Sequence, residues 1–339
     1  MDGYAAGRAV LADRTALVFP GQGSQFPGMG AEFAEDGVAD RWFAAADEVL
    51  GLKLGELCRS GSAEELRATE IAQPAVLVAS LIAWEALRGR GIEPAVVAGH
   101  SLGEYTALVT AGVLEWTDAL RLVRRRGELM AAAADRNPGR MAAVLGPSSA
   151  EVESWCARVH AETGEIVAVA NHNAPRQQVV SGTLAGVDAV RTLARAEGAD
   201  VVLLKVSAPF HSELMRDAQT EFAADLDAVD FGVPRVPVIA NATGDYVLDG
   251  AAARDALRVQ LCAPVRWTAT MRLLADQEIA SVVEVGPGHV LTNLAGLCAP
   301  ELPAVSVGSA AGLSAAVDRL HGSVALTDRH SDAAVRSAT

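Results

Sequence analysis

The 339-residue sequence has little cysteine, little lysine and few aromatic residues. Its four cysteines lie far apart without a CxxC pair, which excludes a zinc ribbon and a disulfide framework and favours a reducing cytoplasm. Aromatic residues make up 4% of a chain that is 50% apolar, so alanine, valine and leucine must fill the core. We find no run of about 20 apolar residues that would span a membrane, and residues 1–14 lack the apolar block of a signal peptide.

Positive charge is also scarce. The formal net charge is −14, which argues against a nucleic-acid-binding surface. Only Lys53 and Lys205 are lysines among the 28 basic residues. Arginine binds carboxylates and phosphates through a fixed fork of N–H donors, which lysine lacks. We therefore expect an anionic partner to meet local arginine clusters that oppose the overall charge.

Buried strands alternate with helices along most of the chain. The apolar pattern predicts strands at residues 15–19, 95–99, 236–240 and 281–285. It predicts helices at residues 74–88, 104–111, 116–134, 252–261 and 268–275. This alternation indicates an α/β fold with a largely parallel sheet that is covered on both faces.

A different pattern runs from about residue 140 to residue 206. Strands are predicted at 141–145, 166–170, 178–181 and 200–206, and helices at 148–162 and 187–196. The β-α-β-β-α-β order predicts a ferredoxin-like unit that closes its own sheet. We therefore expect a discontinuous large subdomain at residues 15–138 and 207–322, with a small subdomain inserted at 139–206. Flexible termini are expected at 1–14 and 323–339.

Ser101 is the centre of a Gly-x-Ser-x-Gly pattern at residues 99–103, between a predicted strand and a predicted helix. Glycine on both sides permits a sharp turn that lifts the Ser101 hydroxyl to the carboxyl edge of the sheet. The amide of Leu102, at the helix start, would then point at an oxyanion formed by attack from Ser101. This context favours a nucleophile over an ordinary glycine-bracketed turn.

A nucleophilic serine requires a general base, and histidine is the usual one. His211 follows a buried strand in a loop that Pro209 stiffens, so we favour it as the base. His172 and His289 lie in predicted loops and stay open as alternatives. His100 is adjacent to Ser101 and is expected to be structural, because neighbouring side chains on such a turn diverge.

Two further segments could complete the site. The glycine loop at residues 21–25 could supply a second oxyanion amide, and its spacing does not match a phosphate-binding P-loop. Residues 124–126 are three consecutive arginines on a predicted helix, where successive side chains point about 100° apart. At most one can face the serine. A buried arginine there would require an anionic ligand or a fixed carboxylate.

Six motifs in this order resemble a known family. They are Gly21-Gln22-Gly23-Ser24-Gln25, Gly99-His100-Ser101-Leu102-Gly103-Glu104, Arg126-Gly127, Pro209-Phe210-His211, Gln260 before Pro264, and Val285-Gly286-Pro287-Gly288. The chain is similar over residues 15–300 to malonyl-CoA:acyl-carrier-protein transacylases and to the acyltransferase domains of polyketide synthases. The resemblance implies an α/β-hydrolase-like core with an inserted ferredoxin-like subdomain.

The resemblance also implies roles for single residues. Ser101 would be the nucleophile, His211 its base, and the amides of Gln22 and Leu102 the oxyanion hole. Arg126 would hold the free carboxylate of a malonyl group. The carbonyl of Gln260 would orient the histidine in place of an aspartate. The remaining positions implied in the substrate pocket or at its rim are Gln73, Asn171, Asn173 and Phe210.

The implied reaction moves a malonyl group from coenzyme A to Ser101, and then to the phosphopantetheine thiol of an acyl carrier protein. It requires no metal and no cofactor, and we expect a cytoplasmic monomer that binds neither membrane nor nucleic acid. In the polyketide relatives, the aliphatic Leu102 and the bulky Phe210 would go with malonyl selectivity. Carrier proteins are acidic, so we expect docking on arginines near the small subdomain, namely Arg136, Arg140, Arg176, Arg191 and Arg195.

Other functions stay open. A serine thioesterase or hydrolase would use the same pair with water as acceptor, and a lipase-type member would add an acid from Asp118, Asp135, Asp188 or Asp200. A discrete acyltransferase could carry an unusual acyl group between carrier proteins. A non-catalytic docking module could retain the fold. The pathway, fatty-acid or polyketide synthesis, is also open, because Phe210 stands where many fatty-acid members have serine.

Overall fold

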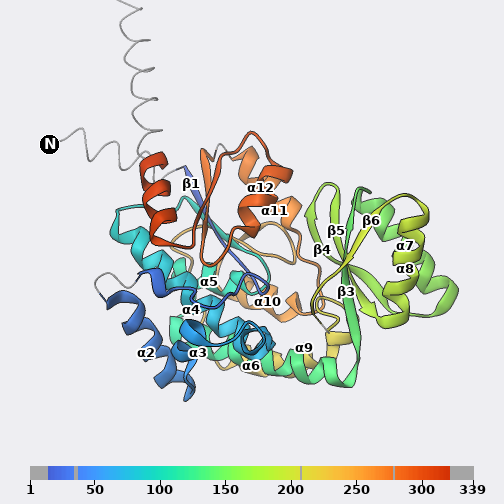
Figure 1. The fold of residues 1–339 in the computed structure, drawn as a ribbon, viewed down its shortest axis with the longest axis horizontal. Helices are drawn as coiled ribbons and strands as arrows, with labels where there is room; N and C mark the ends of the chain where they lie inside the picture. The colour runs from blue at the N-terminus through green and yellow to red at the C-terminus, as the bar shows by residue number, and fades with distance from the viewer. Residues whose placement is uncertain (1–13, 34–36, 207, 278, 321–339) are drawn as a thin grey trace, which may run out of the picture.

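A computed structural model describes residues 14–33, 37–206, 208–277 and 279–320 of the chain. Two β-sheets lie side by side, a large one with helices on both faces and a small one at one end (Figure 1). The expected flexible termini lie outside the described residues, apart from residue 14. All four cysteines are unpaired, which agrees with the absence of a disulfide framework.

The large sheet has six strands in the order β10-β9-β1-β2-β7-β8. Their bounds are β1 Thr15–Phe19, β2 Val96–Gly99, β7 Val238–Ile239, β8 Tyr246–Val247, β9 Ser281–Val285 and β10 Ala304–Val307. Every neighbouring pair is parallel except β7 and β8. The prediction of a largely parallel sheet is confirmed, although β8 and β10 were not predicted.

Both faces of this sheet are covered, as the sequence predicted. Along β1, Leu17 and Phe19 belong to one apolar core, whereas Ala16 and Val18 belong to the other. The first core is covered by α2 Val38–Leu50, α3 Leu54–Ser60, α4 Thr69–Gly89, α5 Gly103–Thr110, α6 Trp116–Arg136, α9 Arg216–Asp227 and α10 Gly250–Gln260. The second is covered by α11 Trp267–Asp276 and α12 Val290–Cys298. Short 3-10 helices lie at Ala31–Phe33, Glu65–Arg67 and Glu213–Met215.

Helix α4 begins at Thr69, five residues before the predicted start at Pro74. Proline inside a helix removes one amide donor and normally breaks the helix. Here the carbonyl of Glu70, four residues before Pro74, accepts a hydrogen bond from Arg124 Nη1 at 2.8 Å. A side chain from α6 thus replaces the lost amide, which sequence periodicity could not show.

The same helix is long and apolar enough to cross a membrane by length and composition. Polar residues interrupt it, so it is not an uninterrupted apolar run. In the structure, 72% of the most apolar 18-residue stretch of this helix is buried, between the sheet and the neighbouring helices. This burial is typical of a core helix.

The small sheet has the order β4-β5-β3-β6, and all its pairs are antiparallel. Its elements are β3 Gly139–Leu145, α7 Ser149–Thr163, β4 Val167–Ala174, β5 Gln177–Thr183, α8 Leu184–Ala196 and β6 Asp200–Leu203. The predicted β-α-β-β-α-β order is confirmed, and Ser148 caps α7 in a capping box with Glu151. The subdomain boundaries at residues 139 and 206 stay a prediction.

Strand β4 differs most from its prediction, because it ends at Ala174 instead of residue 170. The polar sequence Asn171-His172-Asn173 breaks the apolar pattern, yet it stays extended because it pairs with β5 through two register shifts. Asn171 also bridges to Val265 of the large subdomain. Strand β6 ends three residues early, at Leu203, and Leu204 and Val206 line a cavity instead.

Candidate active site

Ser101 occupies the sharp turn between β2 and α5. Its φ is 52°, in the left-handed region that non-glycine residues seldom adopt. A Cβ at Gly99 would overlap the backbone of Gly103, and a Cβ at Gly103 would overlap the carbonyl of Phe19. Asn241 anchors the turn, since its Oδ1 accepts from the Ser101 amide at 2.5 Å. Two glycines and one amide side chain therefore place the serine at the carboxyl edge of the sheet.

His211 faces this serine. Its Nε2 lies 2.7 Å from Ser101 Oγ, and its Nδ1 lies 2.9 Å from the carbonyl of Gln260 and 3.0 Å from that of Ala263. Carbonyl oxygens only accept, so the proton belongs on Nδ1, and Nε2 is left to accept the serine proton. His211 has φ 55°, and it and Ser101 are the non-glycine residues with positive φ in the described ranges. Strain of about 1–3 kcal/mol at each is typical of functional sites.

The imidazole is held in its neutral form. Burial, and then the charges of Arg126 and His100, lower the pKa of His211 from 6.5 to about 3. At neutral pH the side chain is therefore unprotonated and able to accept a proton. The geometry and the charge state both suit a general base.

Arg126 is the inward-facing member of the arginine run, and it is 1% exposed. Its Nη2 donates to Ser101 Oγ at 3.1 Å and to Gln260 Oε1 at 3.0 Å, and its Nη1 donates to Gln73 Oε1 at 2.8 Å. Its Nε is buried without a hydrogen-bond partner among the described residues. Arg124 and Arg125 point elsewhere and pair with acidic side chains, namely Glu128, Glu221 and Asp225.

The nearest buried carboxylate, Glu104, reaches Arg126 only indirectly. Its Oε2 accepts from Gln260 Nε2 at 2.5 Å and from the Asn241 amide at 3.2 Å. Burial raises the pKa of Glu104 to about 7. Within the described ranges no carboxylate lies at ion-pair distance from Arg126. A buried guanidinium without such a partner is a ready site for an anionic ligand.

Two backbone amides are available for an oxyanion. In the described part of the chain, neither the amide of Gln22 nor that of Leu102 donates a hydrogen bond to a backbone carbonyl. Leu102 is the N-cap of α5, so its amide lies at the positive end of that helix. The Gln22 side chain is fixed by Thr69, whose Oγ1 donates to Gln22 Oε1 at 2.5 Å.

Ser101, His211, Arg126 and Gln22 meet in a cavity of about 300 Å³ between the two sheets. Of the residues predicted for it, Gln22, Ser101, Arg126, Asn171, Asn173, Phe210 and His211 line the cavity. Leu102, Gln73 and Gln260 do not line it. Leu102 is fully buried, and Gln73 and Gln260 lie behind Arg126, which they hold. Among the described residues, no group of three or more histidine, cysteine, aspartate or glutamate side chains could hold a metal ion.

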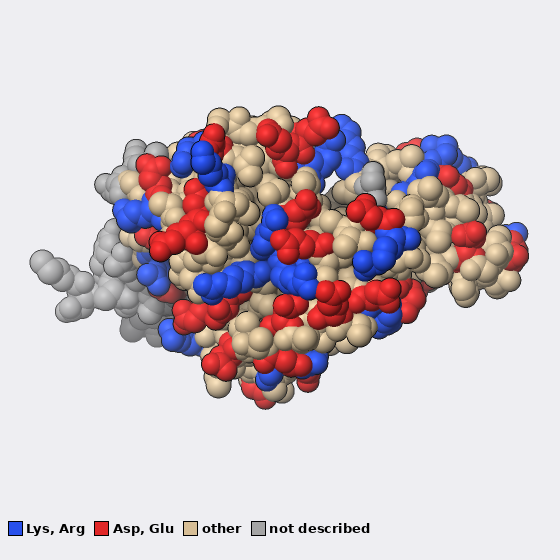
Figure 2. Space-filling model, turned by 90° about the horizontal axis from the view of Figure 1, so that it is seen from below, with Lys and Arg blue, Asp and Glu red and all other residues tan. Residues whose placement is uncertain are grey.

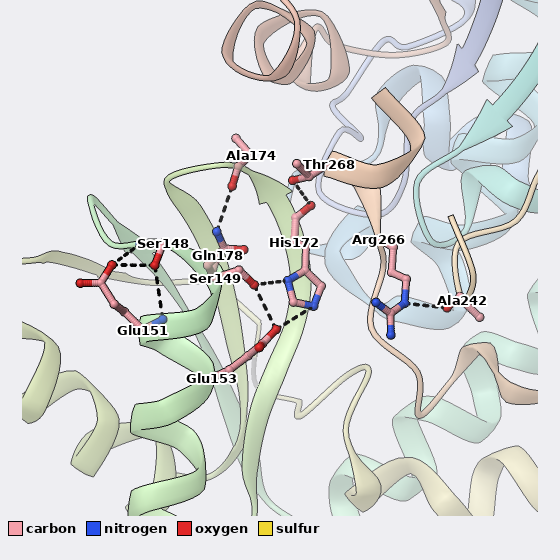
Figure 3. Close-up of polar contacts among 10 residues, drawn as sticks. All are labelled: Ser148, Ser149, Glu151, Glu153, His172, Ala174, Gln178, Ala242, Arg266 and Thr268. Carbon is pink, nitrogen blue, oxygen red and sulfur yellow. Dashed lines mark hydrogen bonds and ion pairs between the residues drawn. The ribbon is translucent and has the colours of Figure 1, made fainter. Parts of the chain in front are cut away.

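Three other histidines near the predicted site, His100, His172 and His289, make no hydrogen bond to the serine. His100 Nε2 lies 2.9 Å from Asn173 Oδ1, in the structural role expected for it. His172 points away, toward Ser149 and Glu153 (Figure 3). His289 immediately precedes α12 and is not part of the cavity wall.

Sequence reasoning missed Asn241, Thr69 and the part played by Glu104. Asn241 directly follows a predicted strand, and this position at the carboxyl edge of the sheet was the signal for it. Thr69 lies before the predicted start of its helix and gave no signal.

The fold and the site define an α/β protein in which a serine hydroxyl, a neutral histidine and two free amides are arranged for acyl transfer. Residues 16–299 match the acyl transferase domain family, and the chain belongs to that family. It is 43% identical to the malonyl CoA-acyl carrier protein transacylase of Bacillus subtilis strain 168, over 83% of this chain and 89% of the relative. It is 41% identical to the Salmonella typhimurium protein of the same name, over 89% and 98% of the two chains.

Solved structures agree with this assignment. The malonyl-CoA:acyl carrier protein transacylase of Xanthomonas oryzae superimposes with a TM-score of 0.87 at 41% identity, over 91% of this chain and 98% of that one. A malonyl-transacylase in complex with a type II polyketide synthase acyl carrier protein superimposes with a TM-score of 0.87 at 39% identity, over 90% and 99% of the chains. The predicted fold class and family resemblance are confirmed.

Proposed function

We propose that the protein transfers a malonyl group from coenzyme A to the phosphopantetheine thiol of an acyl carrier protein. The names of the relatives support this reaction. The observation that carries it is the buried guanidinium of Arg126, which lies 3.1 Å from Ser101 Oγ and has no carboxylate partner among the residues that the structure describes. An acyl group that ends in a carboxylate would supply that partner.

In the first half of the reaction, Ser101 Oγ attacks the thioester carbonyl and His211 Nε2 takes the hydroxyl proton. The new C–O bond places a negative charge on the carbonyl oxygen, which the amides of Gln22 and Leu102 stabilise. One such donor contributes roughly 10²–10³ in rate in other enzymes. When the C–S bond breaks, His211 returns its proton to the coenzyme A thiolate, and a malonyl ester remains on Ser101.

In the second half, the phosphopantetheine thiol gives its proton to His211 and attacks this ester. The C–O bond breaks, and Ser101 regains its proton from the imidazolium. The two substrates use the site in turn, so the kinetics are ping-pong. His211 needs no carboxylate to orient it, because the carbonyls of Gln260 and Ala263 hold its Nδ1 proton. No step requires a metal or a cofactor.

Selectivity follows from charge and shape. A guanidinium pairs with a carboxylate through two parallel hydrogen bonds. An acetyl group would leave Arg126 buried and unpaired, which disfavours it. Phe210 lines the same cavity and would crowd a branch on the malonyl C2 carbon, an effect of about 1–3 kcal/mol per methylene-sized change.

Hydrolysis is the competing function that shares this site. A lipase-type triad has an acid on the histidine, but no carboxylate in the described ranges accepts from His211. Asp118 pairs with Arg121, and Asp188 pairs with Arg140 and Arg191. Transfer to a thiol is therefore the better supported outcome.

The carrier protein is an acidic partner, and we place its docking surface near the small sheet. Of the five arginines expected there, Arg140 and Arg191 share the carboxylate of Asp188. Arg136, Arg176 and Arg195 are thus the stronger candidates. On the face shown in Figure 2, basic and acidic side chains are interspersed. A cytoplasmic monomer acting in fatty-acid or polyketide synthesis fits this function.

Mass spectrometry after mixing with malonyl-CoA tests the proposal. The wild-type protein should gain one malonyl adduct, and Ser101→Ala should gain none. Addition of holo acyl carrier protein should then move the adduct to the carrier thiol. Malonate released at the same rate with and without carrier would instead establish a hydrolase. A protein that gains no adduct would be a docking module.

A further inference from the structure

A second cavity, of about 380 Å³, lies on the opposite side of the β4–β5 hairpin from the active site. Its walls come from the start of α7, from this hairpin, and from α11 with the residue before it (Figure 3). Side chains alternate between the two faces of a strand. Asn171 and Asn173 therefore line the catalytic cavity, whereas His172 and Ala174 line the second one. The proposed reaction uses none of the residues in this second wall.

Gln178 supplies an unpartnered acceptor in this wall. It is 1% exposed, and its Nε2 donates to the carbonyl of Ala174 at 2.9 Å. The carbonyl can only accept, so this bond fixes the orientation of the amide and leaves Oε1 on the other side. Gln178 Oε1 is buried without a hydrogen-bond partner among the described residues. A buried acceptor of this kind is costly unless a ligand donates to it.

The cavity has a basic side. Arg266 and Arg272 both line it, and neither is within ion-pair distance of an acidic group in the described part of the chain. Arg266 Nε donates to the carbonyl of Ala242 at 2.9 Å, which holds this guanidinium in place. The first turn of α7, from Ser149, lines the cavity too, and its first two amides have no intrahelical acceptor. Helix starts and arginine forks both bind phosphate.

Glu153, one turn further along α7, adds an acidic acceptor on the same side of the cavity as Ser149. Glu153 Oε1 accepts from Ser149 Oγ at 3.1 Å, and it lies 3.8 Å from His172 Nε2. Burial lowers the pKa of His172, so the imidazole is neutral at pH 7 and does not cancel this carboxylate. A bare anion would satisfy only the arginines. A ligand that also carries hydroxyl or amino groups would satisfy Glu153 and Gln178 as well.

We propose that this cavity binds a phosphate monoester that carries hydroxyl or amino donors, of the size of a nucleoside monophosphate or a sugar phosphate. The phosphate lies against Arg266 and Arg272. The donors face Gln178 Oε1 and Glu153. A cavity of this volume falls within the usual range for small-molecule sites.

Calorimetric titration of the full chain tests the proposal, with 5′-AMP, glucose 6-phosphate, adenosine and inorganic phosphate as probes. At least one phosphate monoester should bind with a dissociation constant below about 1 mM, and adenosine and inorganic phosphate should bind at least about tenfold more weakly. The comparison of 5′-AMP with glucose 6-phosphate distinguishes a nucleotide from a sugar phosphate.

Two variants localise the binding. Arg272→Ala removes an exposed charge, and Gln178→Leu removes the buried acceptor; each should weaken binding about tenfold. Arg158→Ala, at an exposed arginine on α7 that pairs with Glu162 and does not line the cavity, should leave the affinity unchanged. Circular dichroism and thermal unfolding verify that each variant is folded, and Arg272→Ala keeps the test valid if Gln178→Leu does not fold. Absence of binding by both monoesters, equal binding of inorganic phosphate, or full affinity in Arg272→Ala would overturn the proposal.

Discussion

Arg126 Nη2 lies 3.1 Å from Ser101 Oγ, so the group proposed to recognise the substrate touches the proposed nucleophile. The same nitrogen donates to Gln260 Oε1 at 3.0 Å, and the backbone carbonyl of Gln260 accepts from His211 Nδ1. Gln260 therefore positions both Arg126, the proposed carboxylate clamp, and His211, the proposed base. The guanidinium charge also lowers the pKa of His211, which keeps the base unprotonated.

Arg126→Ala should reduce self-acylation by malonyl-CoA about 100-fold or more, because two charge-assisted hydrogen bonds to the carboxylate are lost. The rate with acetyl-CoA should fall much less, so the preference for malonyl should collapse. Single-turnover mass spectrometry with both thioesters measures this ratio. Arg125→Ala is the matched control, because Arg125 is the neighbour on α6 that pairs with Glu221 and Asp225. An unchanged malonyl-to-acetyl ratio in Arg126→Ala would refute the clamp.

The rate of self-acylation should begin to fall only at a pH far below the ordinary pKa range of histidine. A base with a pKa of 6.5 would lose about 30-fold in rate between pH 8 and pH 5. Because burial lowers the pKa of His211 to about 3, self-acylation should stay nearly constant over this interval. Glu104, with a pKa of about 7, is the other group in the site that titrates there, so Glu104→Gln serves as control. A midpoint near 6.5 in both proteins would contradict the prediction.

The stability of the protein should respond to acid through the same two residues, with opposite signs. The pKa of His211 is lower in the folded protein than in the unfolded chain. Between about pH 6.5 and 3 the unfolded chain therefore binds a proton that the folded protein does not, and the stability decreases as the pH is lowered. Glu104 is raised from 4.5 to about 7, so between these values the folded chain holds the extra proton and stability rises as pH falls.

Glu104→Gln removes the second effect and leaves the first. Its free energy of unfolding should therefore drop by about 2 kcal/mol more than that of the wild type between pH 7.5 and pH 5. Urea unfolding at the two pH values measures the difference. His211→Ala provides the converse control, since its stability should increase on the same acidification. Parallel pH dependence in all three proteins would show that these groups do not control it.

The sequence was sufficient to predict those elements whose conformation is determined by residues close to them in the chain. Glycines two positions either side of Ser101 predicted the turn, because no larger residue fits it, and apolar runs predicted most strands of the large sheet. The orientation of Arg126 could not be read from three adjacent arginines, since it depends on which neighbours carry carboxylates in space. Asn241 is 140 residues from Ser101, whose amide it holds, and only the parallel pairing of β2 with β7 brings the two together.

Helix α4 shows the same limit. Pro74 marked the predicted helix start, because local rules place proline in a first turn. The true start five residues earlier depends on Arg124, which lies 54 residues away from the carbonyl it bonds. The extra turn contains Thr69, so an error in one helix boundary concealed a residue of the site.

Thr69 connects Gln22, in the glycine loop at residues 21–25, to Arg126 through Gln73. An arginine can only donate, so Gln73 must present Oε1 to Arg126 and Nε2 to Thr69, at 2.8 and 3.2 Å. The hydroxyl of Thr69, which accepts from Gln73, is then left to donate to Gln22 Oε1. The guanidinium of Arg126 therefore sets the direction of each of these three hydrogen bonds, from Arg126 through Gln73 and Thr69 to Gln22.

Thr69→Val should therefore reduce the self-acylation rate about tenfold with little change in KM for malonyl-CoA, because the Gln22 amide loses its fixed position while the thioester still binds. Thr69→Ser restores the hydroxyl and should restore the rate. The matched control is Thr106→Val on α5, a buried threonine whose Oγ1 has no hydrogen-bond partner among the described residues and whose loss should leave the rate unchanged. Rapid-quench kinetics over a range of malonyl-CoA concentrations separates the two parameters. If Thr69→Val changed KM alone, or if Thr69→Ser failed to recover the rate, Thr69 would serve packing and not the position of the oxyanion amide.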